Sequence, residues 1–317
     1  MKIFVFTLFI FFTISLRAQF APQAGADGTT AIYKDSSIIN YCATNCEISR
    51  GFVNIADTSL GLASYGENSS AIGNADNIVV SLGDSGSAIL SFDIAITNGD
   101  GADFAIFENS FSDFFLELAF VEVSTDGRNY VRFPSISLTQ DSLQVASFGE
   151  INPQDINNLA GKYRGGFGTP FDLSDLPEND SVNIDSINFI KIIDVVGTID
   201  TLFASYDSQG NIINDPYPTS FNSSGFDLDA VGIINYRLKN DINNIVKEND
   251  INVYYNSINQ NLYINNNISE VYIFNVMGVL NKYFENANIC NLSNLNTGVY
   301  IAKIVSKNSI KTYKFLK

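Results

Sequence analysis

Short apolar runs separated by Gly, Asn and Asp residues follow one another along almost the whole chain, and this pattern restricts the fold to β-sheet. They are five to ten residues long and rich in Ile, Val and Phe, which is typical of strands. One short helix is predicted within 152–159, with Asn152 as the cap and Pro153 at the first helical position. Many strands joined by turns predict an all-β fold, a β-sandwich or jelly roll. The clearest runs are 78–82, 87–96, 116–123, 187–196 and 227–234.

Two turns are predicted to close hairpins. The Gly-Asp-Ser-Gly segment 83–86 lies between the first two apolar runs. Asp126-Gly127 lies between the run 116–123 and the aromatic run 130–133. An Asp-Gly pair between apolar runs is a strong hairpin signal, because both residues tolerate the positive φ that the tight turn needs.

The first 18 residues are predicted to be a cleaved secretory signal peptide. Met1-Lys2 gives a charged start, 3–16 is apolar, and Ala18 provides a small residue before the cut. The apolar run has 14 residues, fewer than the roughly 20 that span a membrane. No cysteine lies at the expected cut, so a lipid anchor is not predicted.

The amino-acid composition excludes several kinds of catalytic and metal site. The chain contains no histidine and no tryptophan, so it cannot form a Ser-His-Asp or Cys-His triad, and imidazole-based zinc sites are excluded. Any chemistry must use carboxylates, Lys, Arg, Tyr or hydroxyl groups.

The charge is distributed unevenly, which predicts two domains. Residues 19–235 contain 29 acidic and 7 basic residues, a net charge of −22, whereas 236–317 contain 5 acidic and 9 basic residues, a net charge of +4. An acidic body argues against binding nucleic acid, which requires a basic face. The polar stretch 236–250 is predicted to link a cargo domain, 19–235, to a terminal domain, 251–317.

The cysteines suggest one small disulfide. Cys42 and Cys46 are close enough in sequence to pair in an oxidising compartment. A metal pair is the alternative, but two thiolates without further Cys or His ligands make a poor site. Cys290 is interpreted as a buried single thiol.

Two acidic clusters are candidate calcium ligands, since carboxylate and carbonyl oxygens are what calcium binds. Asp100, Asp103 and Glu108 belong to a Gly-rich turn and the strand after it. Asp227 and Asp229 alternate along a predicted strand, so they are expected to share one face. Ordinary turn and strand-end acids are the alternative for both clusters, and a general acid/base pair is a further alternative for the second.

Aromatic residues on two long loops are candidate ligand contacts. Tyr163, Arg164 and Phe167 lie in the glycine-rich stretch 158–173, and Tyr206 and Tyr217 lie in or beside the turn-rich stretch 207–218. Loops of a β-sandwich commonly carry binding residues, and aromatic rings provide large contact areas. The alternative is that these rings pack into the core.

Three blocks near the end resemble the type A C-terminal sorting domain of the type IX secretion system of Bacteroidota. They are 270–278, 291–303 and the basic end 311–317, in the family's order. The family's opening Tyr-Pro-Asn-Pro-like element has no proline in the corresponding stretch, Val-Tyr-Tyr-Asn-Ser at 253–257. The resemblance implies a small Ig-like β-sandwich, export through the type IX machinery, and release from the cell or attachment to its outer-membrane surface.

The body resembles a family of secreted bacterial proteins described as cell-surface proteins. The resemblance covers most of 24–235 and is carried by the blocks 81–90, 101–109, 121–127 and 225–231. It supplies no ligand.

These features together lead us to expect a non-catalytic surface protein that binds a glycan or another nutrient, with calcium holding its loops. It could hand its ligand to an outer-membrane transporter. A carboxylate-based hydrolase and a structural or adhesive surface protein are the alternatives. Aromatic rings that converge with Asp227 and Asp229 in one cleft would favour the hydrolase. Rings on a shallow face away from the acids would favour binding.

Overall fold

A computed structural model describes residues 20–239, 251–265, 268–306 and 309–317. The chain forms two compact units, Met1–Lys239 and Asn240–Lys317, which are considered separately. Both are built from antiparallel strands, as the sequence predicts. The helical segments in the described ranges are short 3-10 turns: η1 (Thr58–Leu60), η2 (Asn68–Ala71), η3 (Pro153–Asp155) and η4 (Leu173–Asp175). No helix among the described residues has the length and apolar character to cross a membrane.

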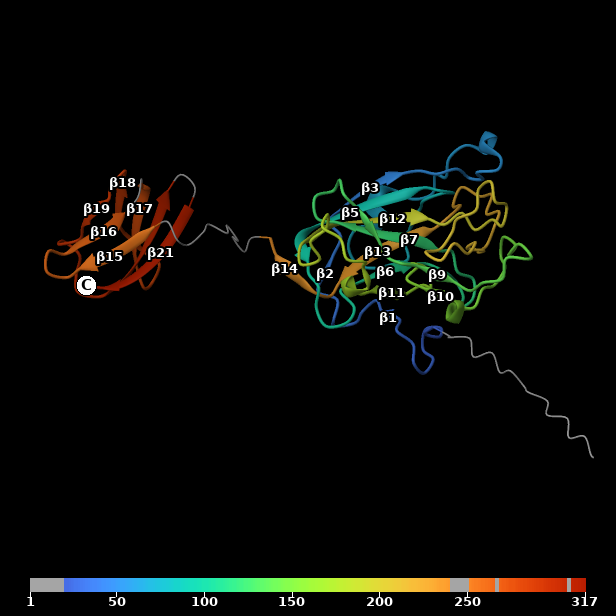
Figure 1. The fold of residues 1–317 in the computed structure, drawn as a ribbon, viewed down its shortest axis with the longest axis horizontal. Coiled ribbons are helices and arrows are strands. Elements are labelled where there is room, and N and C mark those ends of the chain that lie inside the picture. The colour runs from blue at the N-terminus through green and yellow to red at the C-terminus, as the bar shows by residue number, and fades with distance from the viewer. Residues whose placement is uncertain (1–19, 240–250, 266–267, 307–308) are drawn as a thin grey trace, which may run out of the picture. The chain divides into compact units, whose positions relative to one another are not determined.

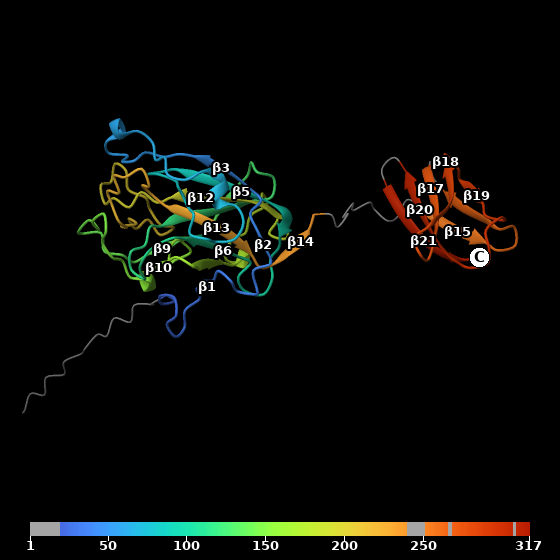
Figure 2. The same ribbon diagram turned by 180° about the vertical axis from the view of Figure 1, so that it is seen from behind.

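The larger unit is a β-sandwich of two six-stranded sheets, consistent with the expected jelly roll. Figures 1 and 2 show the two sheets as facing layers. The first sheet has the order β1 (Ile32–Tyr33), β11 (Phe167–Phe171), β6 (Phe104–Glu108), β13 (Asp227–Ile233) and β2 (Tyr41–Cys42), and β4 (Val80–Ser81) also pairs with β13.

The second sheet contains the longest strands of this unit. Its order is β14 (Tyr236–Leu238), β5 (Ser87–Ile96), β12 (Ile187–Asp194), β7 (Ala119–Ser124) and β8 (Val131–Arg132), and β3 (Asn45–Ser49) also pairs with β5. The predicted Asp126-Gly127 hairpin is confirmed, since β7 pairs with β8 across it. A small two-stranded sheet, β9 (Ile136–Ser137) with β10 (Ile156–Asn157), lies outside the two layers.

The core fills the space between the two sheets. Leu90 and Ile190 of the second sheet and Phe104, Ile106 and Leu228 of the first belong to one buried cluster. Along β5 and β12 buried residues alternate with less buried ones over part of the strand, because successive side chains of a strand point to opposite faces. Each fully buried side chain of this size contributes about 1.5–3 kcal/mol, so this core dominates the stability of the unit.

The predicted hairpin at 83–86 is wrong, although its turn exists. Gly83 has a φ of +77° and its carbonyl accepts a hydrogen bond from Gly86 N–H, 2.7 Å away. The strands on either side do not pair with each other, however: β4 pairs with β13, and β5 pairs with β3, β12 and β14. The turn therefore carries the chain from one sheet to the other.

Two further local predictions are refined. Tyr236–Leu238 forms the strand β14 against β5, so the cargo domain runs past 235 and the predicted linker starts too early. Its remainder, 240–250, lies outside the described residues, as does the predicted signal peptide. The predicted helix is the single turn η3, with Pro153 at its start and the Asn152 side chain accepting from Gln154 N–H.

The predicted disulfide is not formed. Cys42 lies in β2 of the first sheet and Cys46 in β3 of the second, and both are free thiols. The Cys42 thiol donates to Asn74, 3.2 Å away, while Cys46 is buried in the core. Burial raises the pKa of the Cys46 thiol to about 12, which keeps it protonated.

The smaller unit is a compact β-sandwich, as expected for 251–317. One sheet has the order β15 (Asn252–Asn256), β16 (Asn261–Asn265) and β19 (Ile289–Asn291), and the other β18 (Leu280–Glu285), β17 (Ile268–Asn275), β20 (Val299–Ser306) and β21 (Ser309–Leu316). The two sheets share a buried cluster that includes Leu262, Val271 and Ile304. Cys290 is buried in this cluster as a free thiol, in agreement with its interpretation.

Candidate functional site

Much of the acidity of the larger unit is buried, which is unusual because an unpaired buried carboxylate is costly. Eight carboxylates are buried within the described residues: Asp84, Asp103, Glu108, Glu117, Asp194, Asp207, Asp215 and Asp229.

Several of these carboxylates organise loops by accepting backbone hydrogen bonds. Asp194, at the end of β12, accepts from Phe226 N–H at 2.7 Å and from Ser85 N–H at 3.0 Å. Asp215 accepts from Leu118 N–H at 2.9 Å. Burial raises the pKa of both carboxyl groups well above their usual range, and their hydrogen bonds only partly oppose it.

One pocket combines buried acids with exposed aromatic rings. It has a volume of about 330 Å³ and lies where the loop after β6, the start of β13 and two other loops meet. Its polar lining includes hydroxyl groups as well as carboxylates. The lining residues are Asn109, Ser110, Phe111, Phe115, Glu117, Ser147, Phe148, Thr219, Phe221, Ser223 and Asp227.

Four phenylalanines form a continuous row along this pocket. Phe111 stacks on Phe115 with 4.5 Å between ring centroids, Phe115 lies 6.1 Å from Phe148, and Phe148 lies 5.9 Å from Phe221. Phe111 is 70% exposed, Phe148 66% and Phe221 50%. A clustered set of exposed rings beside a pocket is typical of a contact surface rather than of a solvated exterior.

The two acids that line the pocket, Asp227 and Glu117, interact electrostatically with each other and with Glu108, which is not in the lining. Asp227 accepts a hydrogen bond from the Ser81 hydroxyl, and burial raises its pKa to about 6 while Arg50 opposes this. Glu108, at the end of β6, accepts from Ser110 N–H at 2.8 Å; burial, and then the charge of Asp227, raises its pKa. Three carboxyl groups including Glu117 therefore resist being charged together.

Glu117 differs from the other buried acids. It is only 9% exposed and lines the pocket. Burial raises its pKa well above the usual range, and the charges of Asp227 and Glu108 raise it further. Within residues 20–239, no hydrogen bond or ion pair reaches its carboxylate. Its hydrogen-bonding capacity is therefore available to whatever enters the pocket.

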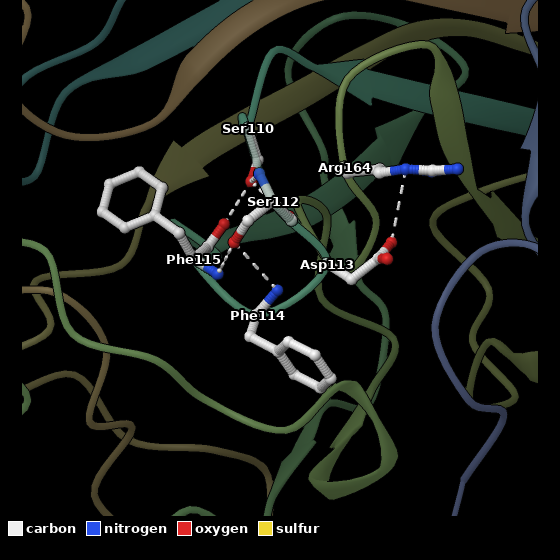
Figure 3. A network of polar contacts seen from close by, with 6 residues as sticks. All are labelled: Ser110, Ser112, Asp113, Phe114, Phe115 and Arg164. Atoms are coloured by element: carbon white, nitrogen blue, oxygen red, sulfur yellow. Dashed lines mark hydrogen bonds and ion pairs between the residues drawn. The ribbon is translucent and has the colours of Figure 1, made fainter.

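The loop that carries the first two rings is held in place by a polar network, shown in Figure 3. The Ser112 hydroxyl accepts from Phe115 N–H at 2.8 Å, and the Ser110 hydroxyl donates to the Phe115 carbonyl. Arg164 Nε lies 3.4 Å from Asp113 Oδ1 on the same loop. These contacts position the rings before any ligand arrives, which lowers the entropic cost of binding.

The five predicted ligand-binding residues do not line this pocket. Tyr163 is buried, with its hydroxyl 2.8 Å from Thr30 Oγ1, and Tyr217 is buried with its hydroxyl donating to Asn54 Oδ1 at 2.7 Å. For these two rings the alternative, packing into the core, holds.

Arg164 has a positioning role, and its guanidinium carbon also lies 4.5 Å from the Phe167 ring centroid. Phe167 in turn contacts Tyr33 at 5.4 Å between centroids. Tyr206 is 45% exposed and outside the pocket.

The first predicted calcium cluster is spread over different environments. Asp100 is exposed, whereas Asp103 is buried and accepts from Gly99 N–H and Leu173 N–H at 2.8 Å and from the Asn235 side chain at 2.9 Å. Glu108 is buried at the end of β6 and is not among the residues that line the pocket. The structure does not bring these three together.

The second predicted cluster is divided as well. Asp227 lines the pocket, while Asp229 accepts from Asp76 N–H at 3.0 Å and from Asn77 N–H at 3.2 Å in another loop. The pairing of β13 with β6 shifts between Leu228 and Ala230, so the regular alternation expected for this strand is interrupted. Among the residues with described placement, no group of three or more Cys, Asp or Glu side chains is arranged to hold a metal ion. Calcium binding stays a prediction.

Sequence reasoning found Asp227 but missed the rings and Glu117. A signal existed in Ser110-Phe-Ser-Asp-Phe-Phe115, a polar loop with three phenylalanines between two strands. Glu117 lies between Leu116 and Leu118 near the start of the apolar run 116–123, a position that indicates burial. Phe148 and Phe221 come from distant loops, and no local pattern connects them.

Comparison with known proteins adds no assignment: neither protein-family models nor curated proteins give a match to this chain. Its function must be argued from the chemistry of the pocket and from the organisation of the chain.

Proposed function

We propose that this chain is an exported, non-catalytic binding protein whose pocket captures a glycan unit or another small nutrient ligand. The observation that carries this proposal is the row of Phe111, Phe115, Phe148 and Phe221 beside carboxylate and hydroxyl acceptors. Phenyl faces cover the apolar face of a ligand, and carboxylates accept its hydrogen bonds. The volume of about 330 Å³ suits a small ligand or one unit of a longer chain.

Removing one ring of the row should weaken binding. We expect Phe148→Ala to lower the affinity for a ligand found in a glycan and metabolite screen about 10-fold or more, since losing a buried ring face costs about 1.5–3 kcal/mol. The fold should be little affected because this ring is largely exposed. Calorimetric titration of the mature chain measures the change.

Phe114→Ala is the matched control, because Phe114 is also partly exposed and lies outside the pocket. Equal affinities of the two variants would contradict the assignment of the pocket. A screen in which the mature chain binds no ligand would favour the structural or adhesive alternative.

One observation favours a second candidate, a carboxylate-based hydrolase. Glu117 and Asp227 lie in the same pocket, and glycosidases act through a pair of carboxyl groups that flank the scissile bond. The rings also converge with one of the acids singled out in the sequence. Turnover of a bound glycan that disappears in Glu117→Gln would favour this candidate over simple binding.

Export is proposed to depend on the smaller unit, acting as a type IX sorting domain. Its separate core supports this division, because the body can keep its own packing without it. We expect deletion of 251–317 to leave the protein in the periplasm with the melting transition of its body retained. Fractionation and surface protease accessibility test this. Normal arrival of the truncated chain at the cell surface would refute it.

Two partners follow from this proposal: the secretion machinery, and an outer-membrane transporter to which a surface protein could pass its ligand. The protein would then be secreted or held at the outer-membrane surface. Nucleic acid is not among the proposed partners, because the net charge of the body is −22.

A further inference from the structure

Glu117 lines the pocket and is surrounded by other acidic groups. The groups that act electrostatically on its carboxyl are Asp227, Glu108, Asp215 and Asp194, and all four are acidic. Its own side chain is nine-tenths buried and receives no hydrogen bond from the described part of the chain. A buried carboxylate in such surroundings is stable only when it is protonated or when a cation reaches it.

Among the described residues, no lysine or arginine lines the pocket. Arg50 acts on Asp227, but its guanidinium donates to the backbone carbonyls of Tyr65, Ser81 and Gly66. The ion pairs within the described residues use Arg132, Arg164 and Lys191, none of which lines the pocket. Within the described residues no ion pair reaches Glu117, so a cationic ligand is an alternative to protonation for stabilising this carboxylate.

We infer that the pocket selects a ligand with a protonated amino group, which binds Glu117 and Asp227 while its apolar face packs on the phenylalanine row. This inference rests on the proposed function, since it assigns the ligand of the same pocket. Ammonium–carboxylate hydrogen bonds are charge-assisted and strong. A cation beside aromatic ring faces gains further from their electrostatic quadrupole.

The lining favours an organic cation over a metal ion. Calcium takes six to eight oxygen ligands, and the four phenyl rings of the row contribute none. The Ser110 hydroxyl is already used by the backbone of its own loop. An amino sugar unit satisfies both halves of the pocket, because it carries an ammonium group on a ring with apolar faces.

The test is a calorimetric titration of the mature chain at neutral pH with matched ligands. A glucosamine oligomer is compared with its N-acetylated form and with the glucose oligomer of the same linkage. Benzylamine, which is protonated at neutral pH, serves as an ammonium group without a sugar, and calcium chloride as the metal. We expect the glucosamine oligomer to bind about 10-fold tighter than either neutral oligomer, because only it forms the charge-assisted pair.

Glu117→Gln should remove this preference and leave weak binding of the neutral oligomers, while Asp100→Asn, which removes an exposed acid outside the pocket, should retain the preference.

Equal binding of charged and neutral oligomers, unchanged in Glu117→Gln, would overturn the inference and leave the proposed glycan binding intact. Binding of benzylamine without binding of any sugar would keep the inference and overturn the glycan assignment. Calcium binding that depends on Glu117, with no amine binding, would replace the inference by a metal site, and no binding by any probe would overturn both proposals.

Discussion

The larger unit is expected to become more stable as the pH falls from 8 to 5. Burial raises the pKa of Asp84 and of Asp227 to about 6, and it raises the pKa of Glu108 and Glu117 well above the usual range. Between the unfolded pKa near 4 and these raised values, the folded state binds more protons than the unfolded state. The free energy of unfolding therefore decreases as the pH rises through that window.

The size of this effect is several kcal/mol. Raising the pKa of one buried carboxyl from its usual value to about 6, as at Asp84, corresponds to about 3 kcal/mol of free energy. The trend should reverse at more acidic pH. Burial acts to raise the pKa of Asp207, but hydrogen bonds from Ser137, Asn211 and Gln209 together lower it, and their stabilisation is lost once that carboxyl is protonated. Denaturant titrations of the mature chain at pH 5, 6, 7 and 8 measure the slope.

The substitution Glu108→Gln tests whether a buried carboxylate causes the dependence of stability on pH. Glu108→Gln removes a buried charge and keeps an acceptor for Ser110 N–H, so it should raise stability at pH 8 and flatten the pH dependence. Asp100→Asn removes an equal charge from an exposed turn and should change neither quantity appreciably. Stability that rises from pH 5 to pH 8 in the wild-type chain would show that these acids are not buried as described.

The strands could be predicted because their signal is local. The run 187–196 is rich in Ile and Val and becomes the central strand β12, since a strand covered on both sides by neighbours needs such residues. The pairing across Asp126-Gly127 was equally local, because turn and strands are adjacent in sequence.

Pairing between sheets could not be predicted from such signals. The turn at 83–86 has the expected glycine geometry, but turn chemistry does not state whether the next strand stays in the same sheet. In this sandwich the turn connects the two layers. For the same reason Cys42 and Cys46, four positions apart in sequence, belong to different sheets.

Sequence reasoning identified one carboxylate of the candidate site, Asp227, but not its aromatic rings. Its acids could be identified as a class, because the lack of histidine leaves carboxylates as the main reactive groups. Which acids face a pocket depends on tertiary burial. Asp103 and Asp229 look as suitable as Asp227 in the sequence, but their oxygens accept backbone hydrogen bonds outside the pocket, whereas Asp227 lines it. The row of rings joins three loops, so only the fold assembles it.

Asp103→Ala is expected to be among the most destabilising single substitutions in the larger unit. The Asp103 carboxylate is fully buried and joins three segments, through Gly99 N–H, Leu173 N–H and the Asn235 side chain. Alanine would leave the buried Leu173 N–H without an acceptor, while Gly99 N–H is open to water and the Asn235 side chain keeps the Ala102 carbonyl. An unsatisfied buried donor costs about 1–3 kcal/mol and the two part-buried contacts add less, so we expect a loss of about 2–4 kcal/mol in the free energy of unfolding.

The same substitution separates a structural role from the predicted calcium role. Asp100→Ala, three positions earlier in the same turn but exposed, is the matched control and should change stability by less than about 0.5 kcal/mol. If Asp103 acts through its hydrogen bonds, its loss should be equal in chelator and in millimolar calcium. If Asp100 and Asp103 hold calcium, both variants should lose the stabilisation that calcium gives the wild-type chain, because a ligand stabilises the folded state in proportion to its occupancy. Wild-type stability of Asp103→Ala in both solutions would contradict both roles.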